Sequence, residues 1–137
     1  MENNKAYTGL EQSKILSKIL HKETADFCWG LDEGHMENGL NVYNYNAVPY
    51  PLPWKDYTAK DAYIPCWSLA ALIDQLDEFV YDDEGKDYDL HIFIEDGGYY
   101  VQYDNNYDGE ILVESGFQDR LIDAVFDVII KLNELGY

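Results

Sequence analysis

The sequence predicts an α+β fold: a small antiparallel sheet of three to four strands, arranged as a meander, with helices packed on one face. Residues 88–103 predict the sheet, because two segments of alternating apolar and polar residues flank Asp96-Gly97-Gly98, a pattern typical of a β-hairpin. Residues 117–135 predict the helical layer, because their apolar residues recur at helical spacing. With 137 residues the chain has ordinary single-domain length, and we expect one domain over residues 1–137.

The N-terminal residues predict two helices. Thr8-Gly9-Leu10-Glu11 fits a capping box at the start of a helix whose apolar residues continue to Leu20. A second, short helix is expected to begin at Thr24, to bury Phe27, Cys28 and Trp29, and to end at Gly30.

Glycines and prolines interrupt the chain between residues 30 and 63. A short strand over Leu40–Tyr45 is predicted there. The three prolines of residues 49–54 favour extended, polyproline-like backbone. Such a segment is suited either to an aromatic-lined groove on a partner or to covering the edge of a core.

The second half predicts longer elements. Ser68 is suited to cap a helix that continues to Val80 with its apolar residues on one face. Strands over residues 88–95, 99–103 and 110–114 then form the antiparallel meander. The closing helix is expected to end before Gly136.

Negative charge dominates the composition. The chain has 27 Asp and Glu against 9 Lys and Arg, which gives a formal net charge of −18. A surface that binds nucleic acid or anionic lipid needs clustered Lys and Arg, so we expect neither direct nucleic-acid binding nor membrane binding. This charge attracts cations and basic protein surfaces, although solubility alone would also account for it.

The two cysteines and the lengths of the apolar segments indicate where in the cell the protein is expected. Cys28 and Cys66 lack the spacing of a metal or redox motif, and we expect each to pack as a small apolar side chain. No segment has the apolar length of a signal peptide or a membrane span. The cytoplasm is therefore the expected location, and no resident cofactor is expected.

Three motifs together resemble small uncharacterised proteins encoded by bacteriophages and integrated mobile elements. They are residues 64–72 (IPCWSLAAL), residues 98–103 (GYYVQY) and residues 123–132 (DAVFDVIIKL). Cys66 stands where that group is expected to have Ala, a small-for-small change. The resemblance implies an accessory role such as modulating a host protein, and it implies no activity and no catalytic residue.

The segment 104–109 matches the start of a calcium-binding loop. Asp104, Asn106 and Asp108 place oxygen ligands at alternate positions before Gly109. The twelfth position of such a loop requires a bidentate Glu and is here Ser115, and the flanking residues predict strands instead of helices. The same residue types are common in hairpin turns, which is the alternative interpretation.

Two sets of carboxylates are candidate binding residues. Asp119, Asp123 and Asp127 recur every four residues on the expected solvent face of the closing helix, and Asp74, Asp77 and Glu78 form a comparable set on the helix expected after Ser68. Rows of negative charge at this spacing can imitate a DNA backbone toward a basic protein. A solvated helix face is the simpler interpretation.

The motifs of catalysis are absent from the sequence. No Ser-His-acid motif, phosphate-binding Gly loop or His-x-x-x-His pair occurs, and His21, His35 and His91 are far apart. We therefore expect a non-catalytic binding protein that uses acidic and tyrosine-rich surface to contact a host or phage protein. The alternatives are a DNA-mimic inhibitor of a basic nucleic-acid-binding protein and, from a different class, a small enzyme or calcium-dependent protein.

The tyrosines carry part of this hypothesis, since tyrosine gives large contact area at low entropic cost. The residues expected at the surface are Tyr43, Tyr45, Tyr50, Tyr57, Tyr99 and Tyr107. If most of them were buried, the hypothesis of a tyrosine-rich binding surface would lose its support.

Overall fold

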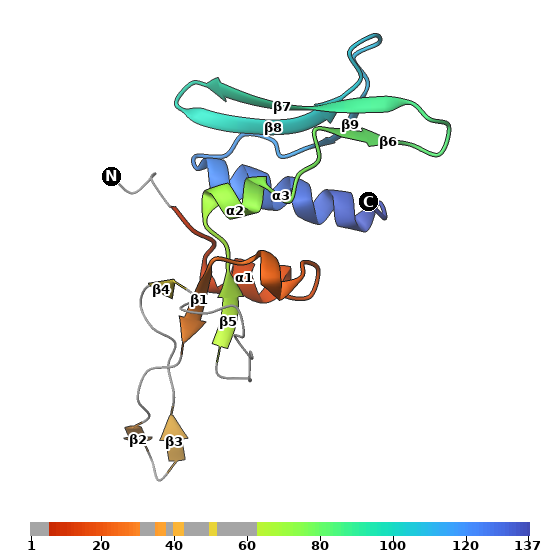
Figure 1. Ribbon diagram of the computed structural model, residues 1–137. Helices are drawn as coiled ribbons and strands as arrows, with labels where there is room; N and C mark the ends of the chain where they lie inside the picture. The colour runs from red at the N-terminus through yellow and green to blue at the C-terminus, as the bar shows by residue number, and fades with distance from the viewer. Residues whose placement is uncertain (1–5, 31–34, 38–39, 43–49, 52–62) are drawn as a thin grey trace. The chain divides into compact units, whose positions relative to one another are not determined.

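The computed structural model describes residues 6–30, 35–37, 40–42, 50–51 and 63–137, and the side chains of residues 6–30 and 64–137. Within these, the chain forms two compact units, Tyr7–Ala71 and Leu72–Tyr137 with Ala6. Helices and antiparallel sheets occur together, which confirms the α+β class (Figure 1). The single domain over residues 1–137 stays a prediction, and each unit is described by itself.

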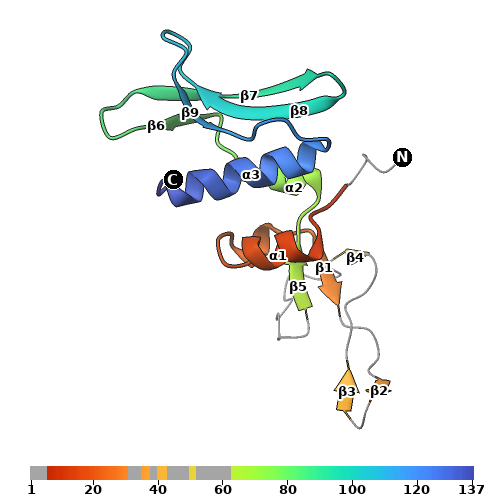
Figure 2. The ribbon, with the colours of Figure 1, turned by 180° about the vertical axis from the view of Figure 1, so that it is seen from behind.

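The unit after residue 72 contains the predicted meander. Its strands are β6 (Phe79–Tyr81), β7 (Asp87–Glu95), β8 (Gly98–Asp104) and β9 (Ile111–Glu114), paired antiparallel in the order β6-β7-β8-β9. Helix α3 (Leu121–Glu134) follows. Figures 1 and 2 show α3 lying along one face of this sheet, as the sequence predicts.

The β7–β8 hairpin takes its register from a two-residue turn. Asp96 and Gly97 both have positive φ, 51° and 78°, and Glu95 pairs with Gly98. Two left-handed residues match the right-handed twist of the flanking strands, which favours this turn in hairpins. The register then places Ile92 opposite Val101.

Alternation along the strands defines the face that α3 covers. Val101 and Tyr103 of β8 are fully buried, and β8 and β9 are the strands that α3 contacts. The helix contributes the apolar stripe that its spacing predicts, formed by Ile122, Ala124, Val125, Val128, Ile129 and Leu132. The hydroxyl of Tyr103 donates a hydrogen bond to the Asp77 carbonyl oxygen at 2.6 Å, and burial raises the pKa of Tyr103.

The helix predicted from Ser68 to Val80 is much shorter than expected. Helix α2 covers Leu69–Ile73, and residues 79–81 form strand β6 instead. Val80 lies opposite Tyr88 and is buried, whereas Phe79 and Tyr81 on either side are exposed. Residues 79–81 are aromatic or β-branched, types that favour a strand. Pairing with β7 therefore decides their structure, although their apolar spacing continues that of a helix.

In the other unit, a small sheet replaces the short helix expected from Thr24. A 3-10 turn, η1 (Lys22–Thr24), is followed by strand β1 (Phe27–Gly30), so the helix prediction for Phe27, Cys28 and Trp29 is wrong. β1 pairs with β4 (Tyr50–Pro51) on one edge and β5 (Tyr63–Cys66) on the other. A central strand buried on both faces has a continuous apolar run, which sequence spacing does not distinguish from a buried helix.

The remaining elements of this unit are short. Helix α1 (Leu10–Leu16) confirms the predicted first helix but ends before Ile19 and Leu20, which the prediction included. Strand β2 (His35–Glu37) pairs with β3 (Leu40–Val42). The predicted strand at Leu40 is thus confirmed as far as Val42, and residues 43–45 lie outside the described residues. The polyproline-like segment is described at Tyr50–Pro51 alone, where it pairs with β1.

The capping box of α1 starts one residue later than predicted. Gly9 occupies the N-cap, and its amide donates to Gln12 Oε1 at 2.9 Å. Thr8 is instead fully buried, and its hydroxyl oxygen accepts a hydrogen bond from the Trp67 amide at 3.1 Å and lies 2.8 Å from the Ser13 hydroxyl. The predicted cap residue therefore joins α1 to the chain after β5.

The neighbours of Thr8 complete a buried polar cluster. Trp29 Nε1 donates to Ser13 Oγ at 3.2 Å, and the Cys66 thiol donates to the Thr8 carbonyl at 3.3 Å. Burial raises the pKa of Cys66, which keeps the thiol protonated and unreactive. Ser68 caps α2 as predicted, since its hydroxyl oxygen accepts from the Ala71 amide at 3.2 Å. The Asp26 carboxylate holds Ser68 in place by accepting from its amide and hydroxyl at 2.8 and 2.5 Å.

Thr8→Val removes the hydroxyl at constant shape and leaves the Trp67 amide without its acceptor. We expect the free energy of unfolding to fall by about 1–3 kcal/mol, the cost of an unsatisfied buried polar group. Urea denaturation followed by tryptophan fluorescence measures it, because Trp29 and Trp67 both lie at the cluster. Thr8→Ser keeps the hydroxyl and serves as the control; equal loss in both variants would contradict the hydrogen-bond explanation.

Candidate protein-binding face

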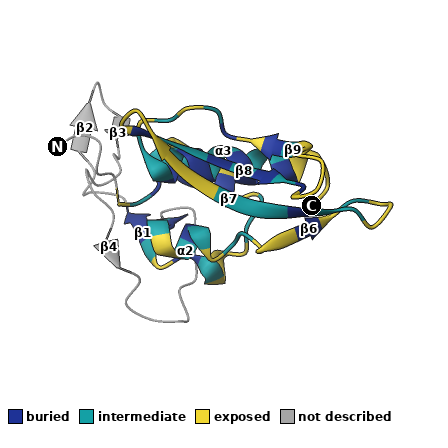
Figure 3. Cartoon of the chain, turned by 90° about the horizontal axis from the view of Figure 1, so that it is seen from above, coloured by how far each residue is buried: buried dark blue, intermediate teal, exposed yellow. Residues whose placement is uncertain are grey.

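The face of the β6–β9 sheet turned away from α3 is the candidate site, and we call it the open face. Its residues follow from the pairing, since they alternate with the buried Val80, Tyr88, Val101 and Tyr103. Figure 3 views this face with the chain coloured by burial. The open face is formed by Phe79, Tyr81, Asp89, His91, Phe93, Tyr100, Gln102, Asp104, Glu114 and, beside β8, Phe117.

Aromatic rings gather at the hairpin end of the open face. Phe93 lies opposite Tyr100 across the β7–β8 pair, and the Phe117 ring meets Tyr100 edge to face with centroids 5.8 Å apart. His91 packs against Phe93 in the same way, also at 5.8 Å. Phe93 and Phe117 remain 41% and 46% exposed, so these rings present apolar surface to solvent.

A glycine makes room for this aromatic group. The chain after β9 continues beside β8, where Gln118 pairs with Tyr99 through hydrogen bonds of 2.8 and 3.0 Å. This pairing brings the Phe117 ring over Gly98. A Cβ at residue 98 would lie 2.2 Å from the Phe117 ring and 2.9 Å from the Gln118 carbonyl oxygen, so the close approach requires glycine.

Two carboxylates face each other farther along the open face, opposite Phe79 of β6 and separated from Phe93 and Tyr100 by the pair of His91 and Gln102. Asp89 of β7 lies directly opposite Asp104 of β8, an arrangement that like charges make unfavourable. Neutral donors offset part of the repulsion: Gln102 Nε2 donates to Asp104 at 2.6 Å, and Asn106 Nδ2 donates to Asp89. Asp89 Oδ1 is buried and lacks a hydrogen-bond partner among the described residues. The pair therefore retains capacity to accept further hydrogen bonds.

The residues of the predicted calcium loop form a turn between β8 and β9. The Asn105 side chain organises it, accepting from the amides of Tyr107 and Asp108 at 2.9 and 3.1 Å and donating to the Asp87 carbonyl at 2.8 Å. The Asp104 and Asn106 side chains turn toward β7 and β8, where they hydrogen-bond to Gln102 and Asp89. Asp108 instead accepts a hydrogen bond from Lys86 at 2.5 Å.

Lys86 holds this turn from the neighbouring loop. Its ammonium also pairs with Glu110, and hydrogen bonds to Asp108 and Glu110 raise its pKa. The same Lys86 contact lowers the pKa of Asp108. No group of three or more His, Cys, Asp or Glu side chains in the described part of the chain is arranged to hold a metal ion. Asp104, Asn106 and Asp108 hydrogen-bond to three different side chains, those of Gln102, Asp89 and Lys86.

The two predicted acidic rows are not helical rows. Helix α3 begins at Leu121, so Asp119 precedes it, and the prediction of three carboxylates along one helix is wrong. Asp127 pairs with Lys131 at 2.8 Å, and both Asp123 and Asp127 are half-buried. Asp74, Asp77 and Glu78 are exposed but lie in the irregular chain between Ile73 and β6, because α2 ends early. Of the spacing that suggested DNA mimicry, the described residues keep the Asp123–Asp127 pair on α3.

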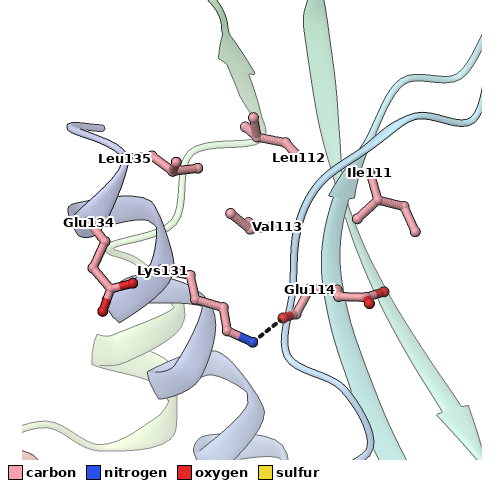
Figure 4. Close-up of a pocket in the computed structure, with 7 residues that line it drawn as sticks. All are labelled: Ile111, Leu112, Val113, Glu114, Lys131, Glu134 and Leu135. Carbon is pink, nitrogen blue, oxygen red and sulfur yellow. Dashed lines mark hydrogen bonds between the residues drawn. The ribbon is translucent and has the colours of Figure 1, made fainter.

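A shallow hollow lies between β9 and the end of α3 (Figure 4). Its walls are mainly apolar, formed by Ile111, Leu112, Val113 and Leu135 with Glu114, Lys131 and Glu134. Lys131 Nζ donates to the Glu114 carbonyl at 2.7 Å. These lining residues include no nucleophile paired with a base, so the hollow offers no arrangement for acid–base or covalent catalysis.

The tyrosine prediction is tested at two of its six positions. Tyr107 at the tip of the β8–β9 turn is 94% exposed, and Tyr99 is half-buried. Tyr43, Tyr45 and Tyr57, and the side chain of Tyr50, lie outside the described residues. Phe93, Tyr100 and Phe117 are not among the binding residues predicted from the sequence, although the alternation of residues 88–95 places Phe93 on the side opposite Ile92.

Comparison with protein-family models, with curated proteins and with solved structures gives no significant match. No helix among the described residues is long and apolar enough to cross a membrane. Any function must therefore be argued from the surface itself.

Gly98→Ala is expected to lower the free energy of unfolding by about 1–3 kcal/mol, the usual cost of overpacking, because the new methyl group overlaps the Phe117 ring. Urea denaturation followed by circular dichroism measures the loss. Phe117→Ala in the same chain should recover part of it, leaving the share due to the Gln118 carbonyl. Wild-type stability of Gly98→Ala would show that Phe117 does not lie over Gly98.

Lys86→Gln is expected to lower the urea midpoint at neutral pH, because it removes both ionic contacts of the β8–β9 turn. Asp108 has a lowered pKa, so its contribution is present above the ordinary carboxyl pKa and is lost as the pH falls. Lys86 has a raised pKa, so its contribution persists into the alkaline range. The difference between wild type and variant should therefore disappear in acid. Lys18→Gln, at an exposed residue of α1's C-terminal turn, is the charge-matched control; a difference independent of pH would contradict the ionic explanation.

Proposed function

We propose that this chain is a non-catalytic binding protein whose open face binds a basic surface of another protein. The observation that carries the proposal is an unfavourable carboxylate pair with an exposed aromatic ring beside it on one sheet face. Phe79 lies directly opposite Asp89 across the β6–β7 pair and is 43% exposed. Phe93 and Tyr100 add aromatic surface farther along the same face, beyond the pair of His91 and Gln102. Such a surface combines apolar contact area with acceptors for cationic donors.

Arginine is the side chain that this combination suits best. A guanidinium is planar, so it stacks on an aromatic ring and donates parallel hydrogen bonds to a carboxylate at the same time. Asp89 Oδ1 is a buried acceptor without a donor among the described residues, so an incoming N–H reaches it only when the Asp89 side chain turns toward the partner. The net charge of −18 would raise the rate of encounter with a basic partner.

The biological setting follows from the resemblance of the motifs at residues 64–72, 98–103 and 123–132 to phage and mobile-element proteins. It supports an accessory role in the cytoplasm, in which the chain modulates a host or phage protein by contact. The middle motif forms β8 up to the residue before Asp104, so the segment that carries the resemblance also supplies Tyr100 of the open face.

The test compares variants of equal charge. Asp89→Asn with Asp104→Asn neutralises the pair on the open face, and Asp83→Asn with Glu84→Gln makes the same charge change in the β6–β7 loop. Tagged wild type and both variants are used to capture partners from a host lysate at low and moderate salt, and the affinity for an identified partner is then measured. We expect the open-face variant to weaken binding about tenfold or more and the loop variant to bind like wild type.

Phe79→Ala separates stacking from charge, because it removes the ring opposite Asp89 and leaves every carboxylate in place. It should also weaken binding, with little change in salt dependence. Thermal midpoints of all variants establish that each is folded. Equal binding by the two charge-matched variants, or no partner at either salt, would overturn the proposal.

A further inference from the structure

The outer edge of β7 is unpaired along its second half. Strand β6 pairs with Asp87, Tyr88 and Asp89, and the Leu90 amide donates to the Glu78 carbonyl at 3.0 Å. Beyond Leu90, no strand in the described part of the chain lies on this side of β7. Because Glu95 and Gly98 close the two-residue turn, the main-chain groups of His91, Phe93 and Glu95 face β8, and those of Ile92 and Ile94 point outward.

The side chains along this edge are large and apolar. Ile92, Phe93 and Ile94 are consecutive, and they are 41%, 41% and 76% exposed. Ile92 and Ile94 lie on the α3 side of the sheet and Phe93 on the open face, so the edge is apolar on both sides. An unpaired edge with this composition is a template for another strand, and proteins usually protect such edges with charge, proline or a covering element.

We propose that a second copy of this chain pairs with this edge, forming an antiparallel dimer with Phe93 on the two-fold axis. In this register Ile92 lies opposite Ile94 of the second copy, and the outward N–H and C=O groups of both residues meet their partners. Phe93 faces Phe93 as a non-hydrogen-bonded pair. His91 lies opposite Glu95, so each end of the paired segment joins a hydrogen-bond donor to a carboxylate.

The neighbouring registers do not fit. The outward N–H and C=O groups belong to the even-numbered residues of β7, and those of one copy must meet those of the other. The register can therefore shift only in steps that keep even-numbered residues opposite even-numbered residues. One shift brings Ile94 opposite Leu90, whose amide already donates to Glu78. The other brings Ile92 opposite Asp96, a turn residue with a φ of 51° that cannot continue a strand. The self-complementary register is therefore the one the edge favours, which identifies a second copy as its occupant.

The dimer would extend the open face. A two-fold axis between antiparallel strands is perpendicular to the sheet, so both helices α3 lie on one side and both open faces on the other. The two Phe93 rings become neighbours at the centre of the joined face. The dimer does not depend on the proposed partner binding, and it can exist whether or not a basic partner is found.

Charge and size limit the strength of this contact. Two copies of a chain with net charge −18 repel each other, but the Debye length is about 8 Å at physiological ionic strength. A short strand pair buries less surface than a stable dimer interface, so the association should be weak and concentration-dependent. Added salt should strengthen it, the opposite of its effect on binding to a basic partner.

Cross-linking tests the register. Residues opposite each other in a non-hydrogen-bonded pair have Cα atoms about 4.5 Å apart, within the range that a disulfide spans. Under mild oxidation Phe93→Cys should therefore form a covalent dimer, whereas Glu95→Cys and the fully exposed Tyr107→Cys should not do so at comparable rate. The native Cys28 and Cys66 are buried and serve as an internal background.

Sedimentation equilibrium tests the association. Ile94→Lys should weaken the wild-type dimer about tenfold or more, while Ile111→Lys makes the same charge change at an exposed residue of β9 and should leave it intact. Ile94→Pro removes an outward N–H without breaking a β7–β8 bond and should also weaken it. A monomer at every concentration, a dimer indifferent to Ile94→Lys, or equal cross-linking of Phe93→Cys and Tyr107→Cys would overturn the proposal.

Discussion

The register that the Asp96–Gly97 turn imposes on β7 and β8 is the constraint on which the second unit depends. Side chains alternate along a strand, so a slip of one residue would exchange the two faces of the hairpin. With β7 held in place, Val101 and Tyr103 of β8 would then face solvent instead of α3. Two residues with positive φ, one of them glycine, hold the pairing in the observed register. The covered face, the open face and the outward groups of the β7 edge all follow from this one turn.

The unit before residue 72 depends on a different interaction. Its elements are short, and the buried Thr8 side chain connects α1 with the chain that follows β5. A polar cluster of this kind requires complete hydrogen bonding, because each unsatisfied group in a buried site is costly. The motif at residues 64–69 therefore has a structural explanation: Cys66 and Trp67 close the cluster, and Ser68 begins α2 with Asp26 as its acceptor.

The sequence predicts the elements that have one clear periodicity. The β7–β8 hairpin, the third strand and α3 are confirmed because an amphipathic pattern and a local turn both specify them. The predictions fail where tertiary pairing decides: β1 is buried on both sides, and β6 follows a helix whose spacing continues for a few residues beyond its end. The open face could not be predicted from the sequence for a further reason. Phe117 reaches it through the bridge between Gln118 and Tyr99, a long-range pairing that no local pattern encodes.

The position of the negative charge matters more than its amount. Most carboxylates at the surface are solvated, and contact with a basic partner there gains little, because water and salt already screen them. Asp89 and Asp104 differ, since the strand register holds them opposite each other and one oxygen of Asp89 is buried. Their repulsion is present in the folded protein and is reduced in any complex that places a cation between them. Phe79, opposite Asp89, adds exposed apolar surface beside the pair. In the proposed complex, the net charge spread over the whole chain directs encounter, while the carboxylate pair beside Phe79 determines where a guanidinium gains most by binding.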